Sequence, residues 1–251
     1  MPAACLSVPP SPARRLRLFC FHHAGGAASV FAGWRTALPA GIDVLPVQLP
    51  GRESRRREAV PPDIDSLVAM LDADLADHVR PPYAFYGHSL GGAVAYQLTR
   101  RRIADGASAP VALLVGACPA PHLRSALQIA NEAGDEALAS AMLRIGGLSE
   151  EMLRYPEWVR AATNLVRADL RMVAVKRRPE PMAMAIPIHL FHGADDPLVS
   201  ADQLSAWANY TTAACVLHRI EGGHFFAREP GDEFFRTLAN ILSPLPEATI
   251  R

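Results

Sequence analysis

The sequence predicts one α/β domain in which helices flank a mostly parallel central sheet. Its 251 residues are enough for one sizeable core, and half of them are hydrophobic. Short apolar runs of strand length alternate along the chain with longer segments of helical periodicity. This alternation is typical of parallel sheets, because a connection, usually a helix, must carry the chain back before the next parallel strand begins.

Six short runs rich in aromatic, branched and other apolar residues are expected to be strands. They cover residues 16–21, 42–47, 83–86, 111–117, 188–192 and 215–220. Several of them are followed, directly or within a few residues, by glycine, histidine or aspartate. Because the carboxyl ends of parallel strands meet at one edge of a sheet, these side chains are expected to lie close together.

Segments with apolar residues three or four positions apart are expected to be helices. They cover residues 63–79, 92–102, 135–145, 156–177, 202–210 and 232–242. The segment 156–177 carries an apolar stripe that begins at Trp158 and continues through Val166 and Val173. Such stripes indicate helices that pack on a core.

Between residues 118 and 185 the strand pattern disappears, and two of the expected helices fall in this interval. We interpret this all-helical excursion as a lid, inserted at about residues 120–185 of a single domain that covers residues 15–251. The Pro-rich residues 1–14 are expected to form a loose N-terminal leader.

Charge and cysteine usage exclude several classes of partner and location. Twenty-five basic residues balance 25 acidic ones, so neither nucleic acid nor a membrane is expected as a partner. We interpret the Arg-rich segment 52–57 as a solvated loop, with a binding role as the alternative. No stretch approaches the roughly 18 apolar residues of a membrane span. The four cysteines show no paired or zinc-like spacing, which favours reduced thiols and a cytoplasmic location.

The segment Gly87-His-Ser-Leu-Gly91 lies between an expected strand and an expected helix. This is the setting that a nucleophile elbow requires: the serine occupies a strained turn, and the two glycines let strand and helix approach each other. The Ser89 hydroxyl would then lie above the sheet edge at the positive end of the helix. Ser89 is therefore the candidate nucleophile.

An acid and a histidine follow Ser89 in the order found in α/β-hydrolases. Asp196 completes a Gly-x-x-Asp pattern that starts at Gly193, with the adjacent Asp195 as the alternative acid, and His224 follows a strand and two glycines. A serine hydroxyl is a poor nucleophile until an imidazole takes its proton, and a carboxylate orients that imidazole. We therefore expect an α/β-hydrolase fold with Ser89, Asp196 and His224 as its catalytic triad.

The turn at residues 22–27, His-His-Ala-Gly-Gly-Ala, follows the first expected strand. α/β-hydrolases place a backbone donor of the oxyanion hole in this region, and small residues allow its N–H to approach a substrate carbonyl. One donor is expected from the N–H of Leu90 and the second from this turn, although a plain Gly-rich turn is an alternative. His22, His23 and His88 are expected to be structural.

No metal-ligand cluster, phosphate-binding loop or dinucleotide fingerprint occurs in the sequence. No metal and no cofactor are therefore expected.

Seven segments together resemble type II thioesterases, the discrete editing enzymes of polyketide synthases and nonribosomal peptide synthetases. They are Phe19-Cys-Phe-His-His-Ala-Gly-Gly26, Phe31-Ala-Gly-Trp34, Leu49-Pro-Gly-Arg-Glu53, Tyr86-Gly-His-Ser-Leu-Gly-Gly92, Leu165-Val-Arg-Ala-Asp169, Gly193-Ala-Asp-Asp196 and Gly222-Gly-His-Phe225. The resemblance implies hydrolysis of aberrant or stalled acyl groups from the phosphopantetheine arm of acyl or peptidyl carrier proteins. It also implies that Ala24 is the second oxyanion donor and that the insertion is a flexible lid.

Other interpretations of the same residues stay open. A fatty acyl-carrier or acyl-CoA thioesterase, a general serine esterase or an acyltransferase would use the same triad. A catalytically silent binding module is the alternative from another class. We expect a monomer that binds carriers transiently. Segment 172–178 departs from the Glu-x-Tyr pattern usual after Arg-Ala-Asp in the family, so the sequence does not predict acyl-chain preference or the docking surface.

Overall fold

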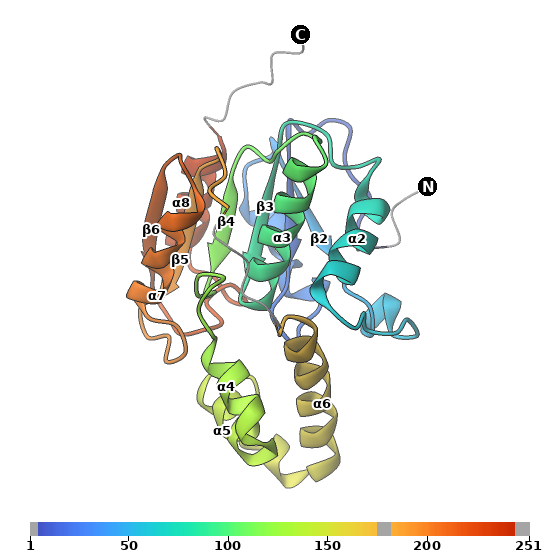
Figure 1. Cartoon of the computed structure of the whole chain (residues 1–251), viewed down its shortest axis with the longest axis vertical. Coiled ribbons are helices and arrows are strands. Elements are labelled where there is room, and N and C mark those ends of the chain that lie inside the picture. The colour runs from blue at the N-terminus through green and yellow to red at the C-terminus, as the bar shows by residue number, and fades with distance from the viewer. Residues whose placement is uncertain (1–4, 175–181, 244–251) are drawn as a thin grey trace.

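The computed structural model describes residues 5–174 and 182–243. Within these ranges six strands form one parallel sheet in the order β2-β1-β3-β4-β5-β6, which confirms the parallel sheet predicted from the sequence (Figure 1). The strands are β1 (Leu16–Phe21), β2 (Ile42–Val47), β3 (Tyr83–His88), β4 (Leu113–Gly116), β5 (Ile188–Gly193) and β6 (Cys215–Ile220).

Helices cover both faces of the sheet because alternate strand residues point to opposite sides. One face packs against α2 (Ile64–Leu75), α3 (Leu90–Ala104), α7 (Ala201–Ser205) and the 3₁₀ helix η4 (Ala206–Tyr210). The other face packs against α1 (Trp34–Ala37), η1 (Ala28–Phe31) and α8 (Asp232–Leu242). The short 3₁₀ helices η2 (Glu53–Arg55) and η3 (Met152–Arg154) lie in connections.

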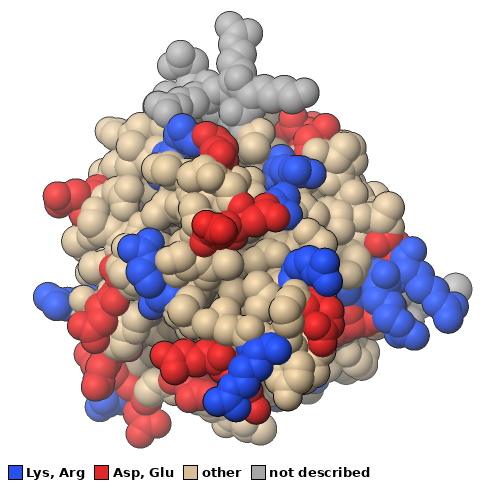
Figure 2. All heavy atoms as spheres, turned by 90° about the horizontal axis from the view of Figure 1, so that it is seen from below, with Lys and Arg blue, Asp and Glu red and all other residues tan. Residues whose placement is uncertain are grey.

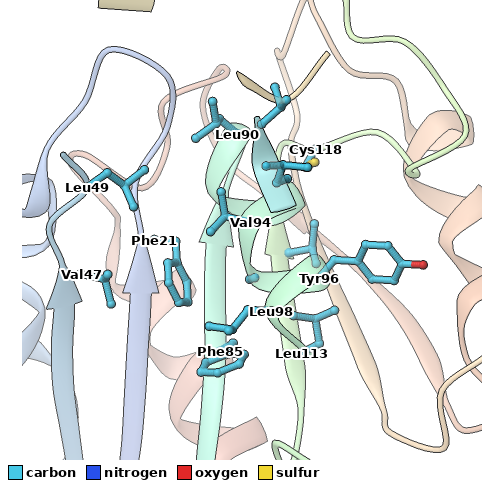
Figure 3. Close-up of a cluster of buried hydrophobic side chains, with 14 of the residues drawn as sticks. Phe21, Val47, Leu49, Phe85, Leu90, Val94, Tyr96, Leu98, Leu113 and Cys118 are labelled. Atoms are coloured by element: carbon cyan, nitrogen blue, oxygen red, sulfur yellow. The ribbon is translucent and has the colours of Figure 1, made fainter. Parts of the chain in front are cut away.

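Helix α3 is the central element of the first face. Its Val94 and Leu98 share a buried cluster with Phe21 and Phe85 of the strands (Figure 3). A Cβ atom on Gly91 would lie 2.1 Å from the carbonyl oxygen of Phe21, so only glycine permits this approach of α3 to β1. The close approach brings the helix N-terminus directly to the carboxyl edge of the sheet.

Among the described residues, three α-helices lie between β4 and β5: α4 (Ala126–Ala133), α5 (Asp135–Arg144) and α6 (Pro156–Met172). They sit together beyond the carboxyl ends of the strands, at the bottom of Figure 1. Helix α4 was not predicted, although a Ser125–Gln128 capping box starts it. Residues 175–177 of the predicted helix 156–177 lie outside the described ranges.

The apolar stripe predicted for residues 156–177 is only partly buried. Val166 and Leu170 are buried, but Trp158 is 53% exposed and stacks on Tyr155 with ring centroids 4.5 Å apart. Placing Trp158 on the packed face was therefore wrong, although its neighbours Val159 and Ala162 do pack against the core.

Several predicted boundaries shift by a few residues. Asp63 caps α2 by accepting a hydrogen bond from the Ser66 N–H at 2.8 Å, so the helix begins one residue later than predicted and ends at Leu75. Helix α3 begins at Leu90 rather than residue 92, directly after the turn. The predicted helix 202–210 is divided into α7 and η4.

The predicted loose leader at residues 1–14 is wrong for its middle part. Cys5 is fully buried, Leu6 pairs with Val47, and the Ser7 N–H donates to the Pro46 carbonyl at 3.2 Å. Strand β2 is an edge strand with backbone groups that require partners, and residues 5–7 supply them. Residues 1–4 lie outside the described ranges.

The four cysteines are free thiols. Cys5, Cys20 and Cys118 are buried, whereas Cys215 is partly exposed at the start of the edge strand β6. Across residues 5–174 and 182–243, no helix has both the length and the apolar character needed to cross a membrane.

We predict that Gly91→Ala destabilises the protein by about 1–3 kcal/mol, because the added methyl group overpacks the contact between α3 and β1. Urea unfolding would measure this change. Gly33→Ala is the matched control: nothing lies within 4 Å of its Cβ position, and we expect a change below about 0.5 kcal/mol. Equal effects of the two substitutions would contradict the packing argument.

Candidate active site

Ser89 occupies the turn between β3 and α3 with a strained backbone, at φ 54° and ψ −118°. Its N–H donates to the Gly116 carbonyl of β4 at 2.7 Å, which holds the turn against the neighbouring strand. A Cβ on Gly87 would lie 2.1 Å from the Gly91 carbonyl oxygen, so the glycines on both sides of Ser89 are required by the tightness of the turn. The predicted elbow geometry is therefore present.

The structure brings the three predicted triad side chains together. His224 Nε2 lies 3.1 Å from Ser89 Oγ, and His224 Nδ1 lies 2.9 Å from Asp196 Oδ2. The side chain of Asp196 is fully buried and His224 is 2% exposed, so water screens this pair weakly. The arrangement can take the proton of the Ser89 hydroxyl and stabilise the imidazolium that results.

Asp196, and not Asp195, contacts His224. The second oxygen of Asp196 accepts hydrogen bonds from the Leu198 and Val199 N–H groups at 2.8 and 3.3 Å. These bonds fix the carboxylate in a loop that follows β5. Asp195 is exposed, and its N–H donates to the Gly222 carbonyl at 3.0 Å. The alternative that the sequence left open is thereby settled in favour of Asp196 as the partner of His224.

His88 holds the backbone of the triad histidine in place. Its Nε2 donates to the carbonyl of His224 at 2.7 Å, while its Nδ1 lies 3.0 Å from the Tyr86 hydroxyl. An Nε2–H that donates to a carbonyl leaves Nδ1 free to accept from the tyrosine, which requires a neutral ring. Burial lowers the pKa of His88 well below its usual value, and this keeps the ring neutral. The predicted structural role of His88 therefore includes fixing the backbone of His224.

The turn after β1 approaches Ser89 from the other side. Ala24 lines the same cavities as Ser89 and His224, and Leu90 lines the larger of them.

Two histidines support the backbone of this turn. The Nδ1 of His22 donates to the His23 carbonyl at 2.9 Å, and the Nδ1 of His23 donates to the Ala24 carbonyl at 3.0 Å. Burial, with the Arg52 charge as a smaller cause, lowers the pKa of His22 to about 3, and burial lowers that of His23 to about 4. Both rings are therefore neutral structural supports of the turn, as predicted.

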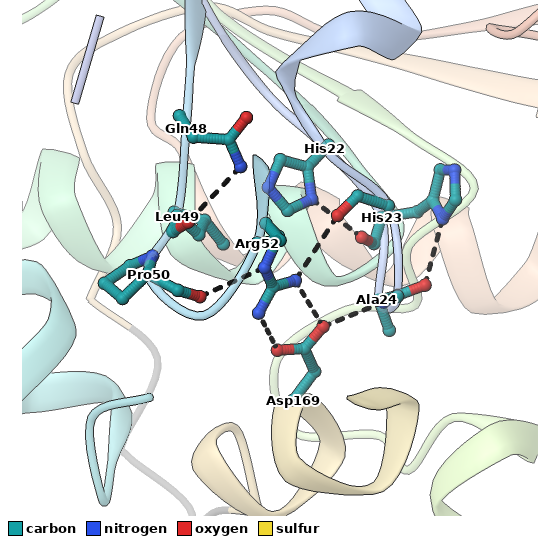
Figure 4. A network of polar contacts seen from close by, with 10 residues as sticks. His22, His23, Ala24, Gln48, Leu49, Pro50, Arg52 and Asp169 are labelled. Atoms are coloured by element: carbon teal, nitrogen blue, oxygen red, sulfur yellow. Dashed lines mark hydrogen bonds and ion pairs between the residues drawn. The ribbon is translucent and has the colours of Figure 1, made fainter. Parts of the chain in front are cut away.

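An ion pair that was not predicted from the sequence lies next to this turn (Figure 4). Arg52 Nη1 and Nη2 lie 2.7 and 2.6 Å from the two carboxylate oxygens of Asp169 in α6, and Asp169 also accepts from the Gly25 N–H at 2.8 Å. Arg52 is 6% exposed and Asp169 is fully buried. The interpretation of segment 52–57 as a solvated loop was therefore wrong for Arg52, and also for Arg55, which is 5% exposed.

One signal in the sequence could have revealed this pair. Asp169 lies three residues after Val166 and one before Leu170, so it falls on the apolar stripe of its helix. A charged residue at such a position requires a buried partner of opposite charge.

Two cavities meet at Ser89. The larger has a volume of about 400 Å³ and extends between the sheet edge and α4, α6 and η4, with Leu127, Leu170 and Trp207 among its walls. The smaller, about 310 Å³, extends beside the turn after β1 towards Phe225 and Arg228. Ala24, Ser89, Leu127 and His224 line both. A substrate attacked by Ser89 could therefore extend in two directions.

Among the residues that the structure describes, no group of three or more His, Cys, Asp or Glu side chains is arranged to hold a metal ion.

Comparison with known proteins places the chain among thioesterases. The thioesterase domain family matches residues 16–242. A probable cadicidin biosynthesis thioesterase from Streptomyces griseus is 29% identical over 235 residues, which make up 94% of this chain and 64% of that protein. The chain thus spans just under two thirds of the length of that relative.

Two solved structures share the fold over almost the whole chain. RedJ, a thioesterase from the prodiginine biosynthetic pathway in Streptomyces coelicolor, has a TM-score of 0.82 at 32% identity, with 94% of this chain and 90% of that chain covered. BorB, a type II thioesterase from the borrelidin biosynthetic cluster, has a TM-score of 0.78 at 34% identity, with 94% and 97% covered. The predicted α/β-hydrolase fold is confirmed.

We predict that Asp196→Asn slows labelling of Ser89 by a fluorophosphonate on the order of 10³- to 10⁴-fold, because the amide favours the wrong imidazole tautomer. Asp195→Asn is the matched control and is expected to label within about twofold of the parent, since surface changes away from the site have small effects. Labelling rates followed by intact-protein mass spectrometry would show which aspartate orients His224. Loss of labelling in the Asp195 variant would reverse the assignment.

We also predict that acid destabilises the fold. The folded-state pKa values of His22 and His23 are lowered to about 3 and 4, so the unfolded chain binds more protons below pH 6.5. Their stabilising contribution is present above that pH and is lost as the pH falls towards the folded-state values, by up to about 1.4 kcal/mol per pH unit for each histidine. Urea unfolding between pH 7 and 4.5 would measure the slope, which should become shallower in His22→Gln. An unchanged slope in that variant would exclude His22 as a contributor.

Proposed function

This chain belongs to the thioesterase domain family, and on that premise we propose that it hydrolyses acyl thioesters on the phosphopantetheine arm of carrier proteins. The acyl groups in question are the aberrant or stalled ones of polyketide or nonribosomal peptide biosynthesis. The observation that carries the proposal is the relay from Asp196 through His224 to Ser89 at the point where two cavities meet. The similar proteins RedJ and BorB are named as thioesterases of prodiginine and borrelidin biosynthesis, which supports a role in a biosynthetic pathway of this kind.

In the first half of the reaction His224 Nε2 takes the proton of Ser89 Oγ as that oxygen bonds to the thioester carbon. The carbonyl electron pair moves onto oxygen, where the N–H groups of Leu90 and Ala24 stabilise it. When the tetrahedral intermediate collapses, the C–S bond breaks and the sulfur takes the proton from His224. The arm leaves as a free thiol, and the acyl group remains as an ester of Ser89.

In the second half a water molecule gives its proton to His224 Nε2 and attacks the acyl carbon. Collapse of the second intermediate breaks the bond to Ser89 Oγ, which regains its proton from His224. The acyl group leaves as a carboxylic acid. All of the groups in this scheme are side chains, backbone N–H groups and water, so the proposed reaction needs no cofactor.

The two cavities match the two parts of a carrier-bound thioester. The larger one has apolar walls suited to an acyl chain, including Leu170, Leu198 and Trp207. The smaller one extends past Phe225 to Arg228, which is exposed. The Arg228 guanidinium could pair with the phosphate of the phosphopantetheine arm. In this arrangement α4 and α6 cover the acyl chain, while Met142 of α5 and Val166 of α6 border the smaller cavity.

We propose that carrier docking is transient and relies on local charge pairs. Acidic and basic side chains are interspersed over most of the face viewed from the lid end, and a group of basic side chains lies at its right edge (Figure 2). Arg228 lines the smaller cavity and is a candidate for contact with an acidic carrier, whereas Arg124 at the larger cavity is paired with Glu132. The proposal assumes that the protein acts as a monomer.

We predict that the protein releases acyl groups from phosphopantetheinylated carrier proteins in a single turnover, and that Ser89→Ala does not. Mass spectrometry of the carrier would follow the loss of the acyl group. Short and long acyl chains tested side by side would describe the larger cavity.

The same assay separates the alternatives. Equal rates with carrier proteins and with acyl-CoA would favour a general acyl thioesterase, and cleavage of oxyesters alone would favour a serine esterase. Accumulation of acyl-Ser89 that an added alcohol or amine resolves faster than water would indicate an acyltransferase. No release and no labelling of Ser89 would support a binding module and overturn the proposal.

A further inference from the structure

We infer that Asp169 is a positioning residue that ties the oxyanion turn to helix α6, so that the Ala24 donor is in place only while α6 is docked on that turn. This inference rests on the proposed function. It adds a residue of the helical insertion to the machinery that stabilises the oxyanion, although Asp169 itself touches neither the substrate nor Ser89.

The hydrogen bond from Gly25 to Asp169 lies directly beside the proposed donor. Gly25 follows Ala24, and its N–H donates to Asp169 Oδ2 at 2.8 Å (Figure 4). Asp169 and Gly25 are 144 residues apart in the chain, so this contact joins two separate structural units. Because consecutive N–H groups share the intervening backbone, fixing Gly25 restricts the direction in which the Ala24 N–H points.

A second contact brings the same helix face against the turn. Val166 lies one helical turn before Asp169, and its Cγ2 is 2.6 Å from the place where a Cβ on Gly25 would be. Gly25 also has a φ of +73°, a conformation that L side chains rarely adopt. The close contact with Val166 and the positive φ both require glycine at this position. The turn and α6 are therefore in direct contact.

Arg52 offsets the cost of burying the Asp169 carboxylate and also bonds to two further segments of backbone. Its guanidinium binds both oxygens of Asp169, while its Nη1 also donates to the Gly26 carbonyl at 3.4 Å and its Nε to the Pro50 carbonyl at 3.1 Å. The loop after β2 is thereby joined to the same network. A buried carboxylate with only the Gly25 N–H as partner would be strongly disfavoured, and the bidentate pair removes that obstacle.

The consequence is that α6 and the oxyanion turn are coupled. Asp169 is the one charged residue among the buried positions of α6, which are Thr163, Val166, Asp169, Leu170 and Met172. If α6 moves away to admit a substrate, Gly25 loses its acceptor and the turn loses the contact with Val166. Full stabilisation of the oxyanion then returns only when α6 closes again.

Two double variants separate the role of the acceptor from that of the charge. Arg52→Met with Asp169→Leu replaces the pair by apolar side chains, an exchange that buried ion pairs often tolerate, and removes the acceptor for Gly25. Arg52→Gln with Asp169→Asn removes both charges but keeps an amide oxygen that can accept from Gly25. The control is Arg102→Gln with Asp72→Asn, which neutralises a pair at 2.6 Å between α3 and α2.

For the Met/Leu variant we expect kcat on a p-nitrophenyl ester to fall roughly 10- to 100-fold with KM within about threefold, because misplacing a donor costs less than the 10²–10³ of removing one. Its affinity for an alkylboronic acid, whose adduct with Ser89 carries a tetrahedral oxyanion, should fall by a similar factor. Its affinity for an S-alkyl pantetheine thioether, which lacks the thioester carbonyl that the oxyanion donors would bind, should not change. The Gln/Asn variant and the control should keep kcat within about threefold of the parent.

Retention of the parental kcat and boronate affinity in the Met/Leu variant would overturn the inference. So would equal losses in both variants at Arg52 and Asp169, since charge or overall packing would then be responsible. The simple ester makes the test independent of the carrier: failure of the parent on carrier thioesters would reject the proposed function, while the comparison on the ester would still decide the role of Asp169.

Hydrogen exchange in the unmodified protein provides a second measurement that needs no variant. The Gly25 amide should be protected from exchange and should exchange through the same opening motion as the amides of residues 166–170. Conditions that change the exchange rate of residues 166–170 should then change the exchange rate of Gly25 by the same factor. Exchange of Gly25 at the rate of an unprotected amide, or through an opening that leaves α6 intact, would contradict the coupling.

Discussion

The site depends on how closely helix α3 approaches strands β1 and β3. Glycine at positions 87 and 91 allows backbone to pack on backbone, where any Cβ would lie 2.1 Å from a carbonyl oxygen. The approach forces the turn at Ser89 into its strained conformation and aims the helix N-terminus at the same place as the serine hydroxyl. The strain is maintained because the Ser89 N–H is also bonded to β4.

Supports from other strands then converge on that point. The loop after β5 supplies Asp196, the loop after β6 supplies His224, and His88 at the end of β3 holds the backbone of His224. The turn after β1 contributes Ala24, and the pair of Arg52 and Asp169 connects that turn to the helical insertion. The site is therefore a junction of many segments, each short and each held by a bond to a neighbouring one.

Local pattern was enough to predict the strands and the three triad positions. The parallel sheet follows from the alternation of apolar runs and helical periods, and Ser89, Asp196 and His224 each follow a strand, where side chains of different segments meet. Residues whose role depends on distant partners were not predicted. Arg52 was interpreted as part of a solvated loop because its partner lies 117 positions away. Trp158 was placed on a packed face, although its ring is exposed and stacks on Tyr155. Helix α4 was missed because it has only eight residues, too few to show a periodic pattern.

The burial of Cys118 has a consequence for chemical selectivity. This thiol lines the larger cavity, where an acyl thioester would be bound beside it, and a thiolate there could capture the acyl group by transthioesterification. Burial raises the pKa of Cys118 to about 12, which keeps this side chain a neutral thiol at neutral pH. A sulfur atom can therefore form part of the wall without competing with Ser89 for the acyl group.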